Sequence, residues 1–149
     1  MSELQVRRRI LGVDFGRARI GVAVSDELGL LAHPLETIPA GKNAALRIVE
    51  LVREKNAERV IVGLPRHMNG SVGEGANEAL AFAGKLQTLC PCEVVTWDER
   101  LTTIAANRAL RDSGRKTRNS RHIVDQVAAQ MILQGYLDSL QAGAIPDLS

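Results

Sequence analysis

The chain has 149 residues, of which 45% are hydrophobic and 24% are charged, with a net charge of +2. This length and composition are typical of a single folded domain with a buried core, so we expect one domain over residues 1–149 with an ordered core at about 8–140. No stretch approaches the roughly 20 apolar residues of a membrane span, and no apolar leader segment follows the basic residues at the start. We therefore expect a cytoplasmic protein that does not contact a membrane.

The N-terminal part of the chain predicts three strands in antiparallel order. Residues 10–13 and 20–25 are apolar runs joined by a short loop that contains Gly16, a pattern typical of a β-hairpin. Residues 29–38 continue as a third extended segment, bent at Pro34. Asp14 therefore lies where a core strand leaves the sheet.

Helices and strands alternate in the rest of the chain. Apolar spacing predicts helices from Lys42 or Asn43 to about residue 54 and over residues 76–87, and buried strands over 59–65 and 93–97. A helix from Thr102 or Thr103 to residue 111 and a last helix over residues 120–140 complete the pattern. The predicted fold class is α/β, with a five-stranded mixed sheet flanked by helices. The sheet combines a three-strand antiparallel meander with two parallel strands, which is the order of the ribonuclease H-like fold.

A basic segment near the C-terminus departs from the charge balance of the rest of the chain. Between residues 108 and 121, six basic residues are opposed only by Asp112. We expect residues 112–120 to form a mobile basic loop. Contact with a polyanion and a solvated loop that only maintains solubility are equally consistent with this pattern.

Acidic residues follow strands that should lie side by side in the sheet. Asp14 follows the first strand and Asp98 and Glu99 follow the fifth, at the carboxyl ends where ligand sites collect in sheets of this kind. Asp125 lies in the first turns of the last helix, where the helix dipole is by itself a sufficient structural reason for a carboxylate.

Three carboxylates aimed at one volume would repel one another unless a cation neutralised them. Oxygen ligands suit Mg²⁺ or Mn²⁺ rather than zinc. Two such ions about 4 Å apart can activate a water molecule and stabilise the leaving oxygen in phosphodiester hydrolysis. Alternation along the fifth strand puts Asp98 and Glu99 on opposite faces, so only one of them should reach such a metal. We prefer Glu99 and keep Asp98 as the alternative acid.

Four motifs, in order, resemble those of the YqgF/RuvX family of Holliday junction resolvases. They are VDFGxxRIGVAVS, VIVGLPxxMNGS, DERLTTxxA and DxxAA, and the resemblance covers residues 8–138. The family implies a ribonuclease H-like nuclease that uses a divalent metal. The reaction it implies is either Holliday junction resolution or maturation of the 5′ end of pre-16S rRNA. Carried over by motif, the catalytic and metal-binding acids are Asp14, Glu99 and Asp125.

Basic residues near the acids and in the basic segment are candidate contacts for the nucleic-acid backbone. The candidates are Arg17, Arg19, Arg100, Arg115, Lys116, Arg118 and Arg121. For those next to the acids, structural salt bridges are equally consistent. The chain has four aromatic residues, and Phe82 and Tyr136 are expected in the core, which leaves no stacking platform for single-stranded nucleic acid. Recognition by backbone shape and charge is the expectation.

Two other classes of function remain open at this point. The opening hairpin also resembles the phosphate-binding start of sugar kinases, actin and Hsp70-type chaperones, but those proteins clamp ATP between two such domains and this chain has length for one. The second class is a non-catalytic nucleic-acid-binding adaptor, although an unneeded cluster of like charges costs stability. For the preferred function the partner is branched DNA or precursor rRNA. Cutting a four-way junction twice predicts a homodimer on that substrate, whereas trimming RNA does not.

Overall fold

The computed structural model describes residues 9–65, 73–99 and 118–143, with the side chains of the last helix described from residue 125 to residue 141. The elements of this part are β1 (Arg9–Asp14), β2 (Arg19–Ser25), β3 (Ala32–Pro39), α1 (Ala44–Lys55), β4 (Ala57–Leu64), α2 (Glu74–Leu89), β5 (Glu93–Asp98) and α4 (Arg118–Gly143). The helix expected over 102–111 and residues 112–117 of the expected basic loop lie outside the described residues. Residues 118–120 belong to the first turn of α4 rather than to a loop.

The five strands form one mixed sheet in the order β3-β2-β1-β4-β5. Strands β1 and β2 pair in antiparallel fashion, as do β2 and β3, while β4 runs parallel to both β1 and β5. This topology confirms the predicted meander and the two additional parallel strands. It also places the carboxyl ends of β1, β4 and β5 side by side at one edge of the sheet.

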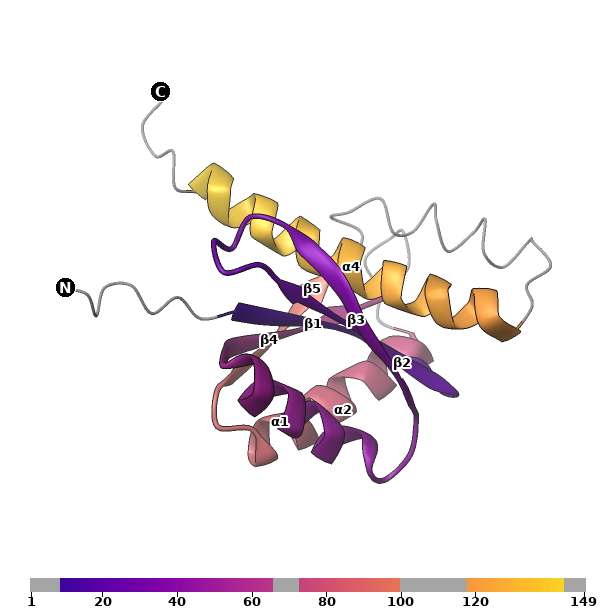
Figure 1. The fold of residues 1–149 in the computed structure, drawn as a ribbon. Helices are drawn as coiled ribbons and strands as arrows, with labels where there is room; N and C mark the ends of the chain where they lie inside the picture. The colour runs from indigo at the N-terminus through magenta and orange to yellow at the C-terminus, as the bar shows by residue number, and fades with distance from the viewer. Residues whose placement is uncertain (1–8, 66–72, 100–117, 144–149) are drawn as a thin grey trace.

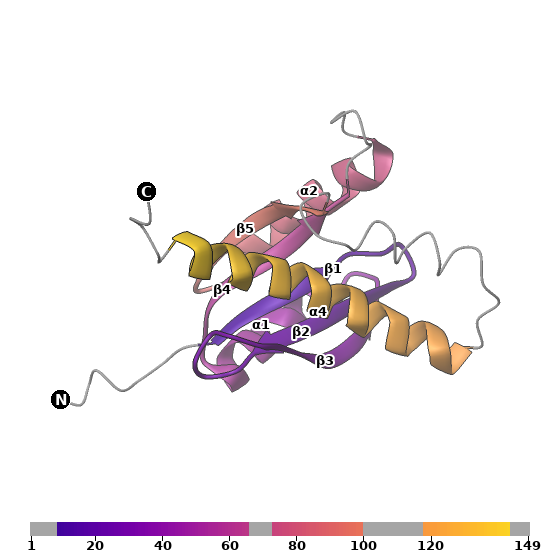
Figure 2. The ribbon, with the colours of Figure 1, turned by 90° about the horizontal axis from the view of Figure 1, so that it is seen from above.

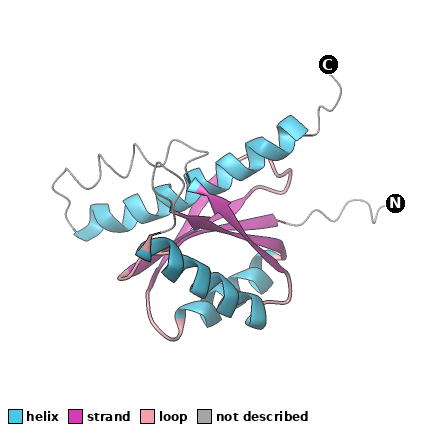
Figure 3. Ribbon diagram, turned by 180° about the vertical axis from the view of Figure 1, so that it is seen from behind, coloured by secondary structure: helices cyan, strands magenta, loops and turns pink. Residues whose placement is uncertain are grey.

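Helices cover both faces of the sheet. Helices α1 and α2 pack on one face and α4 crosses the other, as the views from the front and from behind show (Figures 1 and 3). Alternation along the strands divides the core accordingly: Val60 and Val62 pack with the residues of α1 and α2, whereas Ile61 packs with those of α4. None of the described helices combines the length and the apolar character that crossing a bilayer would need.

Helix α4 lies directly against β1 because residue 12 of that strand is a glycine, which has no side chain to hold the helix away. A Cβ atom at Gly12 would lie 2.6 Å from the Cβ of Leu133 and 3.1 Å from the carbonyl oxygen of Ala129. Glycine inside a strand often marks such a close approach. Figure 2 shows α4 passing over the middle of the sheet. The small residues Ala128 and Ala129 are buried on its contact face.

The third strand begins later than expected, at Ala32 rather than at residue 29. Gly29 has a φ of 73°, and the Asp26 carboxylate accepts hydrogen bonds from the backbone N–H groups of Leu30 and Leu31 at 2.9 and 3.3 Å. The bond from Leu30 also lowers the pKa of Asp26 below its usual value. The carboxylate therefore fixes a turn over residues that the sequence pattern assigned to the strand.

Candidate active site

Asp14 is a buried carboxylate at the carboxyl end of a central strand. Its residue is only 4% exposed. Successive side chains of a strand point to opposite faces. Val13 packs in the core beneath α1 and α2, whereas Gly12 faces α4. Asp14, two residues after Gly12, therefore projects from the face of the sheet that α4 covers.

Helix α4 brings Asp125 to the same place. Gly21 of β2 pairs directly with Asp14, and a Cβ atom at Gly21 would overlap the carbonyl oxygen of Asp125. Paired residues of neighbouring strands share a face, so the backbone of α4 at Asp125 rests on the sheet beside Asp14. Asp125 is itself only 8% exposed.

Glu99 reaches the same face from the other side of β1. Val13 pairs with Val62, so the next residues along these parallel strands, Asp14 and Gly63, lie side by side at their carboxyl ends. A Cβ atom at Gly63 would lie 2.7 Å from Oε2 of Glu99. Glu99 is 4% exposed, so its carboxylate is buried over a strand position that only glycine leaves open.

The neighbouring acid, Asp98, points away from this cluster. It pairs with Leu64, which packs with α2 on the opposite face of the sheet. Trp97, one residue earlier, packs with α4. The strand alternation that was expected to put Asp98 and Glu99 on opposite faces is thus present in the structure. Among the described residues, the buried polar or charged ones are Ser25 and the three acids Asp14, Glu99 and Asp125.

Arg19 supplies a positive charge to this acidic cluster. Its Nε donates to Oδ2 of Asp125 at 2.7 Å, and the two side chains are 30% and 11% exposed. The pair joins the first residue of β2 to α4 across 106 positions of sequence. The sequence left two roles open for Arg19, a contact with nucleic acid and a structural salt bridge. The structure shows the salt bridge.

We expect the Arg19–Asp125 pair to stabilise the fold measurably. In metal-free buffer, Arg19→Gln should lower the free energy of unfolding by about 1–3 kcal/mol, because it removes a charged hydrogen-bond partner from a buried carboxylate. Urea unfolding of the parent, Arg19→Gln, Asp125→Asn and the double variant gives the coupling between the two residues. As a matched control, Arg9→Gln breaks an exposed 3.4 Å pair with Glu27 and should cost about 0.5 kcal/mol or less. Equal losses for the two arginine variants would contradict this prediction.

The other basic candidates are not gathered at the acids in the described part of the chain. Arg17 is exposed and forms ion pairs with Glu78 at 2.8 Å and Glu74 at 3.3 Å, and the bond to Glu78 raises the pKa of the guanidinium. The remaining candidates lie outside the described residues or have side chains that do, namely Arg100, Arg115, Lys116, Arg118 and Arg121. Their contact with nucleic acid stays a prediction.

The donor set of this cluster has the chemistry that a hard divalent cation requires. Asp14, Glu99 and Asp125 offer only carboxylate oxygens, which Mg²⁺ and Mn²⁺ prefer. The absence of a Cβ atom at Gly63 and Gly21 lets the Glu99 carboxylate and the Asp125 backbone lie directly against the sheet. Within the described part of the chain, however, no three His, Cys, Asp or Glu side chains lie close enough together to hold one ion. The chemical type of these ligands therefore suits such a metal, but their spacing in this structure does not. One oxygen of Asp125 also accepts the hydrogen bond from Arg19.

Gly21 and Gly63, which let Asp125 and Glu99 lie against the sheet, were not identified from the sequence. Both lie inside apolar strands, and both occupy positions that alternation assigns to the face of Gly12. Three glycines on one face of neighbouring strands are a signal that a backbone or a buried side chain lies against that face. That signal becomes readable only once the strand register is known.

Comparison with known proteins gives the same family for most of the chain. Residues 8–139 match the family described as RuvX, Holliday junction resolvase. A protein of Nocardia farcinica is 49% identical over 145 residues, covering 91% of this chain and 81% of the relative. A protein of Acetivibrio thermocellus is 47% identical over 135 residues, covering 88% of this chain and 96% of the relative. Both relatives carry the name "Putative pre-16S rRNA nuclease".

Solved structures with a similar fold include a resolvase. Thermus thermophilus RuvC in complex with a Holliday junction substrate has a TM-score of 0.56 at 16% sequence identity, covering 91% of this chain and 97% of that chain. A further structure of Thermus thermophilus RuvC has a TM-score of 0.53 at 15% identity, covering 90% and 96%. This likeness, together with the strand order, shows the ribonuclease H-like fold that the sequence predicted.

Proposed function

The chain belongs to the RuvX family of Holliday junction resolvases, and from this premise we propose that it is a metal-dependent endonuclease acting on structured nucleic acid. The observation that carries the proposal is the burial of Asp14, Glu99 and Asp125 on the same face of the sheet, although their side chains are farther apart than three ligands of one ion. These residues come from three separate segments, yet all are buried at one edge of one face of the sheet. Burying three carboxylates on one face of a sheet costs folding free energy unless a cation neutralises their charge.

In the proposed reaction these residues would hold the cation beside the phosphodiester bond. Asp14 and Glu99 would supply ligand oxygens from the ends of β1 and β5, and Asp125 would supply them from α4. When bound, Mg²⁺ or Mn²⁺ lowers the pKa of a water molecule and stabilises the charge that develops on the phosphate. Arg19 holds Asp125 and offsets part of the negative charge of the cluster. Asp98 lies on the other face and takes no part.

The names of the relatives support two substrates for the proposed nuclease. The family description supports a four-way DNA junction, which also is the substrate bound by the RuvC structure. The names of the Nocardia and Acetivibrio proteins support a pre-16S rRNA. A junction cut symmetrically requires two copies of the site, so a homodimer belongs to the first alternative.

A single assay tests the activity and separates these substrates. The protein is incubated with Mn²⁺ or Mg²⁺ and offered a four-way DNA junction and a structured precursor rRNA in parallel, with EDTA and Asp14→Asn as controls. We expect metal-dependent cleavage that Asp14→Asn lacks, because the variant removes a ligand charge without changing the shape of the side chain. Symmetric nicks in the junction identify a resolvase, and cleavage of the RNA alone identifies an rRNA-processing enzyme.

Three outcomes would contradict the proposal. Equal cleavage by the parent and by Asp14→Asn assigns the activity to a contaminant. Binding of nucleic acid without cleavage under any metal condition identifies the non-catalytic adaptor. Tight binding of ATP, with no binding of nucleic acid, identifies a relative of the sugar kinases and chaperones.

A further inference from the structure

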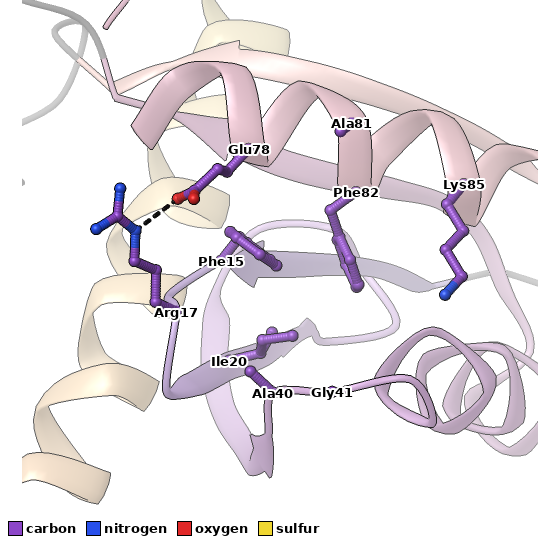
Figure 4. A pocket seen from close by; sticks show the side chains of 9 residues that line it. All are labelled: Phe15, Arg17, Ile20, Ala40, Gly41, Glu78, Ala81, Phe82 and Lys85. Carbon is purple, nitrogen blue, oxygen red and sulfur yellow. Dashed lines mark hydrogen bonds and ion pairs between the residues drawn. The ribbon is translucent and has the colours of Figure 1, made fainter. Parts of the chain in front are cut away.

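The structure contains a second candidate site, a pocket of about 450 Å³ on the face of the sheet that α1 and α2 cover, opposite the face of the three acids. Its walls are the half-buried rings of Phe15 and Phe82 and the side chain of Ile20 (Figure 4). The volume is in the range of roughly 300–1,000 Å³ that is usual for small-molecule sites. The sequence pattern placed Phe82 in the core, and its ring does pack against the core, but the ring also lines this pocket.

The two rings provide an apolar surface of the kind that planar ligands use. Their centroids lie 4.9 Å apart and their planes are inclined by 33°. Neither ring is fully buried, so a flat heterocycle can contact them from the pocket. Stacking of a nucleobase on an aromatic side chain contributes about 1–3 kcal/mol per base and tolerates any base.

Charged groups stand at the two ends of the pocket. The ion pair between Arg17 and Glu78 occupies one end, and the Lys85 side chain extends at the other (Figure 4). Lys85 is exposed and its side chain takes part in no ion pair or hydrogen bond within the described residues. An ammonium beside an apolar slot matches a nucleotide, whose flat base is joined to an anionic phosphate.

The pocket adjoins the candidate active site through two consecutive residues. Asp14 projects toward α4, and Phe15, the next residue, packs against Phe82 of α2 on the opposite side of the sheet. A nucleic-acid strand whose phosphate lies at Asp14 would reach the pocket by passing around the end of β1 at Phe15, so the base that enters would belong to a nearby nucleotide. A base can enter only if it is unpaired and unstacked, which junction centres, loops and single-stranded ends allow and a regular duplex does not.

We propose that this pocket receives one unpaired nucleobase of the substrate strand, next to the bond that is cut. The proposal rests on the nuclease function proposed above and adds a structural requirement to it: the substrate must present an extruded base. A free nucleoside triphosphate is a poorer occupant, because Lys85 is the one lining cation that the described residues leave without an ionic partner.

The test removes the base from the substrate and the aromatic ring from the protein, separately and together, and measures binding. Substrates are prepared with an abasic nucleotide at each of three positions on either side of the mapped cut, and dissociation constants are measured by anisotropy in EDTA. For the parent, one position should show a loss of about 5- to 150-fold, which corresponds to the energy of one stacked base. Phe82→Leu keeps an apolar side chain but loses the ring, so its affinity should no longer depend on the base at that position.

A second variant keeps the test informative if Phe82→Leu unfolds. Lys85→Ala changes an exposed side chain and should weaken binding while reducing the slope of log affinity against log salt by about one. Lys55→Ala, in the last turn of α1 near the opposite edge of the sheet, is the charge-matched control and should change neither quantity.

The outcomes separate this proposal from the proposed function. Cleavage of the intact substrate with no dependence on the base at any position overturns the pocket proposal alone. Loss of affinity in Phe82→Leu that is the same for intact and abasic substrates overturns it too. Competition by micromolar free ATP would reassign the pocket to nucleotides. If the parent neither binds nor cuts any nucleic acid, the nuclease function itself fails.

Discussion

Glu99→Gln is expected to lower the single-turnover rate of cleavage by about 10³-fold, or roughly 4 kcal/mol in activation free energy. The reason is that Glu99 lies over Gly63 beside Asp14, on the face of the sheet that α4 covers. The amide of Gln keeps the shape of the side chain but removes the charge that would hold a divalent cation. Rates are measured with the protein in excess over a substrate that the parent cuts, and binding in EDTA is measured separately.

The adjacent residue provides the matched control for this prediction. Asp98→Asn makes the same chemical change one position away, but Asp98 pairs with Leu64 on the face that α2 covers. Its cleavage rate should stay within about threefold of the parent. If Asp98→Asn is inactive and Glu99→Gln is not, the assignment of the two acids is reversed, and Asp98 becomes the ligand.

Gly21→Ala is expected to be the most destabilising small substitution in the sheet. The added methyl group would overlap the carbonyl oxygen of Asp125, a backbone atom of α4 that cannot rotate away as a side chain could. Helix α4 must then move off the sheet or the methyl must be accommodated by strain. We expect a loss of about 3 kcal/mol or more, and a fall in Tm of about 6–12 °C, measured by thermal and urea unfolding.

Gly84→Ala is the matched control, because it makes the same substitution at a position where the added methyl group meets no other atom. Gly84 is exposed within α2, and a Cβ atom there meets nothing within 4 Å. Alanine is a better helix former than glycine, so this variant should gain about 0.5–1 kcal/mol. A Gly21→Ala protein as stable as the parent would show that α4 does not rest on β2 as described.

Much of the fold could be predicted because each strand shows its environment in its composition. The runs over residues 10–13 and 59–65 are apolar on both faces, as buried parallel strands must be, and they indeed form the centre of the sheet. The start of β3 at Ala32, after the turn that follows β2, could not be predicted. The Asp26 carboxylate replaces strand pairing for residues up to Leu31 by capping their N–H groups, and a local side-chain bond of this kind leaves no periodic signal.

The acids of the site could be predicted from strand ends and motifs, but their surroundings could not. Alternation was enough to separate Asp98 from Glu99 because it needs only the strand itself. The partner of Arg19 could not be assigned, since its contact with Asp125 spans 106 residues and depends on where α4 crosses β2. The pocket beside Phe82 could not be predicted for a related reason: the position of Phe82 on an apolar helix face indicates core packing, which the structure shows, but not that the ring also lines a pocket.

The order of the elements along the chain has a consequence for biosynthesis. Asp14 and Glu99 belong to segments that precede α4, whereas Asp125 arrives with α4, the helix that packs on their face of the sheet in the described part of the chain. Chains emerge from the N-terminus, so a growing chain exposes that face until its final quarter has been made. Under the proposed function, the event that completes the core also delivers the third acid. A growing chain that lacks α4 would therefore be unable to cut the RNA or DNA around it.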